Sequence, residues 1–113
     1  MYLLMRSARV HLGREAEALR WAEELARLYR RTTGGEARVY VETFGAVGTV
    51  YLMDEYKDLA TVERTLAALA EDGEYLAHLA RGAEVLVPGT RQDQLLRLAA
   101  PRVPPASTPP ATG

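Results

Sequence analysis

Charged and phenolic side chains stand inside segments that otherwise alternate like β-strands, and they are the first candidates for chemistry. They are Arg6, Tyr40, Glu42, Tyr51, Asp54 and Glu55. A charge that points into a covered face must be paired or functional. One interpretation is a set of cross-strand or intersubunit ion pairs at the sheet edge. The other is a ligand pocket in which Arg6 binds an anionic group and Tyr40 or Tyr51 donates a hydrogen bond.

Alternation limits how many of these residues can share one pocket. Successive side chains of a strand point to opposite faces. Asp54 therefore shares a face with Val50 and Leu52, while Glu55 shares one with Tyr51. At most one of the two carboxylates faces a given cavity.

The two histidines are candidates of a different kind. His11 follows the first strand-like segment at a turn, where it could line the mouth of a pocket or simply belong to a loop. His78 falls on a helical segment, near a C-terminal end that favours a cation. A single axial histidine is enough to hold haem, so haem stays an alternative for His78. The two are far apart in sequence and lack a ligand-spaced partner, so no metal site is predicted.

Candidate site residues are therefore few. The candidate catalytic residues are Arg6, Tyr51 and His78; the candidate ligand-binding residues are Arg6, His11, Tyr40, Glu42, Tyr51 and Glu55. Cysteine is absent, which excludes thiolate chemistry. No phosphate-binding glycine loop occurs, so no nucleotide cofactor is expected. A reaction would rely on the substrate's own reactivity, with Arg6 stabilising negative charge and a tyrosine or carboxylate moving a proton.

The elements that must position these residues follow a β-α-β-β-α-β order. Expected strands span residues 2–10, 36–44, 49–56 and 84–87, and expected helices span 14–32, 59–71 and 74–80. The stretch 90–100 is compatible with a short helix or an extended arm. This order predicts a ferredoxin-like α+β fold, with an antiparallel sheet and helices on one face.

Residue patterns support the two long helices. Ala18, Ala22, Leu25 and Tyr29 form an apolar stripe at helical spacing. Gly34 and Gly35 follow at the place where a left-handed cap ends a helix. Asp58 is well suited to cap the next helix at its N-terminus.

Apolar residues on both faces of two strands predict a partner. Leu3 and Met5 oppose Leu4 along the first strand, and Tyr51 and Met53 occupy the second face of the third. Helices can cover only one face, and the other would leave an apolar patch in water. We therefore expect a homodimer in which two sheets pack face to face.

Length and composition set the remaining limits. The 113 residues suffice for one domain, expected over residues 1–100, and the proline-rich stretch 101–113 is expected to be a disordered tail. A net charge of −1 argues against nucleic acid. The longest uncharged stretch in the body, residues 43–53, is too short for a membrane helix, and no signal peptide is recognised. A cytoplasmic location is the default expectation.

Three stretches also resemble the dimeric α/β-barrel superfamily. They are residues 9–13 leading into Glu17, Ala18 and Trp21; residues 47–49 before residues 54–59; and residues 71–75. Over about residues 2–98 the chain resembles small bacterial proteins of the NIPSNAP and antibiotic-biosynthesis-monooxygenase groups. The resemblance implies a dimeric α/β barrel. Haem-degrading relatives pair a helical histidine with asparagine and tryptophan, and this chain contains no asparagine.

The expected function is binding of a small, largely apolar organic metabolite. The resemblance extends this to a cofactor-independent monooxygenase-like or isomerase-like enzyme, and the alternative is a non-catalytic dimeric binding or assembly protein. A buried cavity that holds a polar side chain would favour the first, and a fully packed core the second. The expected partners are a second copy and a small organic ligand, without nucleic acid or membrane.

Overall fold

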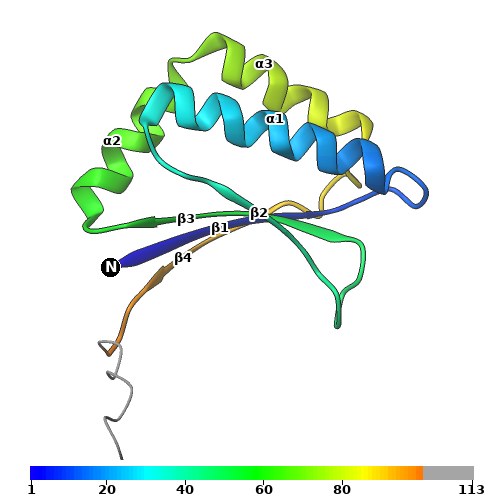
Figure 1. The fold of residues 1–113 in the computed structure, drawn as a ribbon, viewed down its shortest axis with the longest axis horizontal. Coiled ribbons are helices and arrows are strands. Elements are labelled where there is room, and N and C mark those ends of the chain that lie inside the picture. Colours follow the sequence, from blue (N-terminus) through cyan, green and yellow to red (C-terminus); the bar gives the residue numbers. More distant parts are fainter. Residues whose placement is uncertain (101–113) are drawn as a thin grey trace, which may run out of the picture.

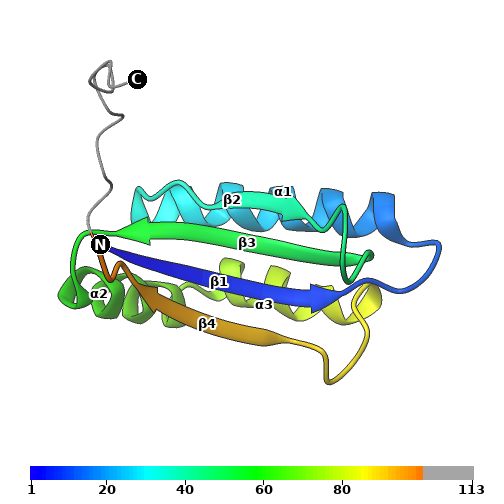
Figure 2. The same cartoon turned by 90° about the horizontal axis from the view of Figure 1, so that it is seen from below.

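Residues 1–100 form a four-stranded antiparallel sheet with helices on one face in the computed structural model, which describes those residues (Figures 1 and 2). The predicted ferredoxin-like α+β class is confirmed. The tail predicted at residues 101–113 lies outside the described residues. No helix within residues 1–100 is long and apolar enough to cross a membrane.

The sheet places β1 at its centre. The strands are β1 (Tyr2–Arg9), β2 (Arg38–Val41), β3 (Thr49–Tyr56) and β4 (Gln92–Arg97), in the spatial order β2-β3-β1-β4. Figure 2 shows β1 between β3 and β4, with β2 at one edge. Arg6 lies opposite Leu52 on β3 and Asp93 on β4.

Three helices cover one side of this sheet. They are α1 (Glu15–Thr33), α2 (Leu59–Ala70) and α3 (Gly73–Arg81), followed by one turn of 3₁₀ helix, η1 (Gly82–Glu84). The predicted stripe of α1 is buried, and Gly34 ends the helix in the left-handed conformation with φ 74°. Asp58 caps α2 by accepting a hydrogen bond from the Thr61 amide at 2.8 Å. Both caps were expected from residue type.

The apolar core lies between the sheet and the helices. Its buried members are Leu4, Leu25, Leu28, Tyr29, Tyr56, Val62, Leu69 and Tyr75. Three of these eight residues are tyrosines, so their hydroxyls need partners inside the protein. The polar groups beside the core therefore form a connected arrangement.

The strand predicted at residues 84–87 is wrong, and the fourth strand is Gln92–Arg97 instead. Leu86 makes only an isolated bridge with Val10. Val85 is buried, and its carbonyl accepts a hydrogen bond from the His11 amide, so this apolar run covers the end of the core. Every residue of β4 is exposed, so its sequence carries no alternation that could reveal a strand.

The strand predicted at residues 36–44 is shorter than expected, at Arg38–Val41. The chain leaves it to make the hairpin connection to β3. Gly45 and Gly48 there adopt φ values of 89° and 96°, which other residues rarely take. The predicted hairpin is thus present, but its connection begins earlier in the chain.

Candidate functional site

A cavity of about 280 Å³ lies between the sheet and the helices, at the end of the sheet where β1 stops. The sheet forms its floor, with Arg6 and Ala8 of β1 and Val50 and Leu52 of β3. The two helices α1 and α3 form its wall, with Trp21, Ala22, Leu25, Leu79 and Ala80. The chain between α3 and β4 completes the lining with Gly82, Ala83, Leu86–Gly89 and Arg91. Most of these groups are apolar. Such a wall with a few polar groups is typical of small-molecule sites.

Arg6 is the charged residue of the cavity floor. Its side chain is 22% exposed. Nη1 donates to the Tyr75 hydroxyl at 3.3 Å, and Nε lies 3.8 Å from Oδ1 of Asp93. Nε is buried and has no hydrogen-bond partner among the described residues. Charge-assisted hydrogen bonds are usually ~2.7–2.9 Å long, so this cation is only weakly compensated.

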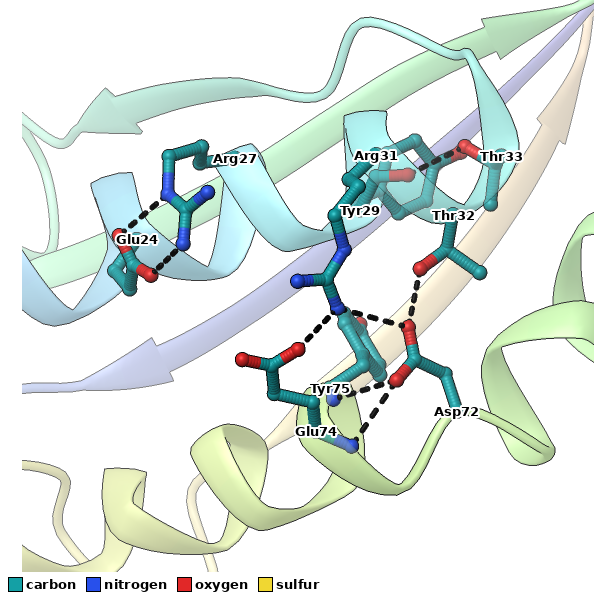
Figure 3. Close-up of polar contacts among 9 residues, drawn as sticks. All are labelled: Glu24, Arg27, Tyr29, Arg31, Thr32, Thr33, Asp72, Glu74 and Tyr75. Carbon is teal, nitrogen blue, oxygen red and sulfur yellow. Dashed lines mark hydrogen bonds and ion pairs between the residues drawn. The ribbon is translucent and has the colours of Figure 1, made fainter.

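Tyr75 is placed by the start of α3, as Figure 3 shows. Asp72 caps this helix by accepting hydrogen bonds from the amides of Glu74 and Tyr75 at 3.0 and 3.1 Å. Thr32 of α1 also donates to the Asp72 carboxylate, and this bond lowers the pKa of Asp72. Arg31 binds Glu74 at 2.6 Å. The junction between α1 and α3 thus fixes the residue that holds Arg6.

A buried polar cluster lies beyond Arg6, away from the cavity. The Tyr29 hydroxyl donates to Oδ2 of Asp54 at 2.5 Å and is also hydrogen-bonded to the Tyr56 hydroxyl. Oδ1 of Asp54 accepts from the Glu55 amide at 2.8 Å. Burial raises the pKa values of Tyr29 and Tyr56 above the usual range of tyrosine. Both phenols therefore remain neutral near neutral pH, and Tyr29 supplies the donor that the carboxylate needs.

Trp21, which lines the cavity, joins α1 to α3 through His78. The indole Nε1 donates to the His78 carbonyl at 2.8 Å, and His78 Nε2 donates to the Trp21 carbonyl at 2.9 Å. The two rings stack with centroids 6.0 Å apart. His78 therefore uses one ring nitrogen to hold the two helices together, which leaves Nδ1 for any other role.

The remaining candidates lie elsewhere. Tyr51 lies between Val50 and Leu52 of the cavity floor, but its side chain is on the opposite face of the sheet, where its hydroxyl donates to Glu42 beside the hairpin. Glu55 is paired with Arg38 across β2 and β3 at 3.4 Å, which agrees with the interpretation of these charges as cross-strand ion pairs. Tyr40 is 43% exposed on the face that carries no helices. The backbone amide of His11 binds the Val85 carbonyl beyond the end of β1.

The structure thus brings Arg6 together with residues that sequence reasoning did not select. These are Trp21, Tyr75, Arg91 and Asp93. Trp21 enters the sequence analysis only through the family resemblance, and Arg91 and Asp93 lie in residues 90–100, which are compatible with a short helix or an extended arm. Tyr75 lies on a short helix, and no pattern in the sequence indicates that this helix contacts β1. Among residues 1–100, no group of three His, Asp or Glu side chains could hold a metal ion.

Comparison with solved structures identifies proteins with a similar fold. An uncharacterised NIPSNAP domain protein from Burkholderia xenovorans matches with a TM-score of 0.71 at 21% identity, over 96% of this chain and 99% of that one. The fold is that of NIPSNAP proteins. A NIPSNAP family protein from Agrobacterium tumefaciens gives 0.69 at 20% identity over 96% of both chains. The resemblance expected from the sequence is thereby confirmed at the level of fold.

A further neighbour belongs to the second group expected. It is a candidate antibiotic biosynthesis monooxygenase from Nitrosomonas europaea, with a TM-score of 0.66 at 14% identity, over 88% of this chain and all of that one (100%). Scans of family models and of curated proteins find no match to this chain. Identities this low carry the fold alone, so function has to be argued from the site.

Proposed function

We propose that this chain binds a small, largely apolar organic molecule in the cavity between its sheet and its helices. The observation that carries the proposal is the cavity itself, about 280 Å³, apolar in most of its wall and holding the weakly compensated Arg6. A fully packed core would have favoured a purely assembling protein. The cavity instead favours a ligand, with Arg6 binding its polar end.

A reaction at this site would be oxygenation or isomerisation without a cofactor. The candidate monooxygenase with the same fold supports the first of these. Arg6 would stabilise negative charge that develops on a ligand oxygen, and Tyr75 would hold the guanidinium in place. The chemical step would then depend on a ligand that is itself easily deprotonated or oxidised.

The cavity can be tested with a neutral probe and one blocking substitution. Trp21 is the single tryptophan of the chain and stands in the cavity wall, so its fluorescence reports on occupancy. Octanol should bind to the wild type and change this fluorescence. Ala8→Leu fills the floor and should weaken octanol binding by about tenfold or more, a loss of ~1.4 kcal/mol.

Ala77→Leu is the matched control, because Ala77 is exposed on α3 and does not line the cavity. It adds the same apolar atoms and should leave octanol binding as in the wild type. Circular dichroism would verify that both variants are folded. Equal octanol binding by the wild type and the folded Ala8→Leu variant would contradict the proposed site.

The protein is also proposed to be a homodimer. Figure 1 shows the helices on one side of the sheet. The opposite face carries the apolar residues Leu3, Met5, Tyr40, Tyr51, Met53 and Leu96. Leu96 is 47% exposed and Tyr40 43% exposed in the single chain. Two copies that pack by this face would remove a continuous apolar surface from water.

Light scattering at low micromolar concentration should therefore give twice the 12.5 kDa of the chain. Met53→Glu introduces a charge at the centre of the sheet and should shift the mass to that of a monomer, because an unpaired charge is costly to bury. Leu76→Glu makes the same kind of change on exposed α3 and should stay dimeric. A monomeric wild type would rule out this assembly at those concentrations.

A further inference from the structure

Three charged side chains meet where β4 borders the cavity. Arg6 and Arg91 both line the cavity, and Asp93 lies between them. Oδ1 of Asp93 is 3.8 Å from Nε of Arg6, and Oδ2 is 3.4 Å from Nη2 of Arg91. Two guanidinium groups thus share one carboxylate. This rim of the cavity carries an excess of one positive charge.

Asp93 is a weak partner for Arg6. A strong charge-assisted bond would be about 1 Å shorter than the observed separation. Asp93 is 43% exposed, so water solvates its carboxylate even without Arg6. Water does not solvate Nε of Arg6 in the same way, because this atom is buried and makes no hydrogen bond among the described residues. A partly buried cation without a close anion favours a ligand that brings one.

We propose that Asp93 is the internal counter-ion of the cavity, and that a monocarboxylate ligand with an apolar body displaces it from Arg6. The inference rests on the proposed function, since it needs a ligand in the cavity. The ligand's apolar body would contact the apolar wall, and its carboxylate would take the place of the Asp93 carboxylate beside Arg6. Asp93 would keep its contact with Arg91 and with solvent.

This arrangement makes Asp93 a specificity-determining residue. Its carboxylate competes with an anionic ligand and leaves a neutral ligand unaffected. One negative charge on the ligand balances the excess positive charge of the rim. Removing the charge of Asp93 should therefore strengthen the binding of a monocarboxylate, which is the opposite of what removing an ordinary ligand-binding residue would do.

Octanoate and octanol form the matched pair of probes, since they share an alkyl chain and differ in charge. Both would be titrated into the full chain with Trp21 fluorescence as the readout. Asp93→Asn should tighten octanoate binding about fivefold, the size expected for a half-exposed ion pair. Arg6→Met should weaken octanoate by about tenfold or more, because a charged hydrogen bond is lost. Asp93→Asn should move octanol binding by no more than about twofold, and Arg6→Met should weaken octanol less than octanoate.

Glu24→Gln is the control for overall charge. It also removes one carboxylate that is paired with an arginine, but on the solvent side of α1, and it should leave both probes unaffected. Unchanged or weaker octanoate binding by a folded Asp93→Asn variant would overturn the inference, as would octanoate binding that survives Arg6→Met. Octanol binding without any octanoate binding would overturn it and leave the proposed function standing. Binding of neither probe would overturn both.

Discussion

The free energy of unfolding should fall steeply once the pH rises above about 10, the ordinary pKa of tyrosine. Tyr29, Tyr56 and Tyr75 are each less than 5% exposed, at 3%, 4% and 1%. Burial raises the pKa of all three, and the hydrogen bond to Asp54 raises that of Tyr29 further. The folded chain therefore keeps these phenols protonated in a pH range where the unfolded chain has lost the protons.

The sign of the effect follows from proton linkage. A raised native pKa means that the folded state binds more protons above pH ~10, so stability falls as the pH rises. The contribution of each tyrosine is fully present below pH ~10 and approaches a loss of ~1.4 kcal/mol per pH unit above it. Each phenol that stays protonated in the folded state adds its own slope, so the three together should make stability fall more steeply than one buried tyrosine would.

Urea unfolding followed by circular dichroism, between about pH 8 and about pH 11.5, measures this slope. Tyr29→Phe should make it shallower by about one proton. It should also cost ~1–3 kcal/mol at neutral pH, because Asp54 loses its hydroxyl donor. Tyr40→Phe in the background of Met53→Glu, where the single chain leaves Tyr40 exposed, should keep the slope of that background. A slope that stays flat across this range in the wild type would contradict the buried neutral cluster.

The helices and the central strands could be predicted because local signals coincide with tertiary burial. The stripe of α1 and the Asp58 cap of α2 each act within a few residues, and the structure realises both. Alternation also placed Asp54 on the opposite face from Glu55. Its partner Tyr29 comes from a helix 25 residues away in sequence, and neither periodicity nor capping specifies such a contact.

The cavity was harder to predict because its wall combines segments of different kinds. Arg6 stands out as a charge inside a strand, and this signal alone selected it. Tyr75 of α3 and Asp93 of β4 contact Arg6, and Trp21 of α1 lines the same cavity. Only the packing of the helices on the sheet brings these residues together. For residues 84–87 the sequence indicated a strand that the structure does not contain. An apolar run that covers the end of a core looks in sequence like a buried strand.

Replacing Gly82 with alanine should destabilise the protein, although the backbone at this position suits alanine. Gly82 is buried with φ −57° and ψ −24°, an ordinary right-handed conformation. A glycine-to-alanine change at such a position usually stabilises by ~0.4–1 kcal/mol. Here a Cβ would lie 2.5, 2.9 and 3.1 Å from Cζ2, Cε2 and Cη2 of Trp21. The rigid indole would have to move.

The indole cannot move without losing other contacts. Its Nε1 donates to the His78 carbonyl, and its ring stacks on the His78 ring. Overpacking of this kind costs ~1–3 kcal/mol, and each kcal/mol lowers the melting temperature by about 4–8 °C in a domain of this size. Thermal unfolding, followed together with Trp21 fluorescence, measures both the loss and the displacement of the ring.

Gly73→Ala is the matched control, since Gly73 is the first residue of α3, Gly82 directly follows the last, and nothing stands within 4 Å of the Cβ position of Gly73. The same added methyl group there should leave the melting temperature unchanged or raise it. The contrast between the two variants therefore isolates the contact with Trp21 from the general preference of helices for alanine. A Gly82→Ala variant as stable as Gly73→Ala would mean that the indole has room to move. The cavity wall formed by Trp21 would then be less rigid than its contacts with His78 indicate.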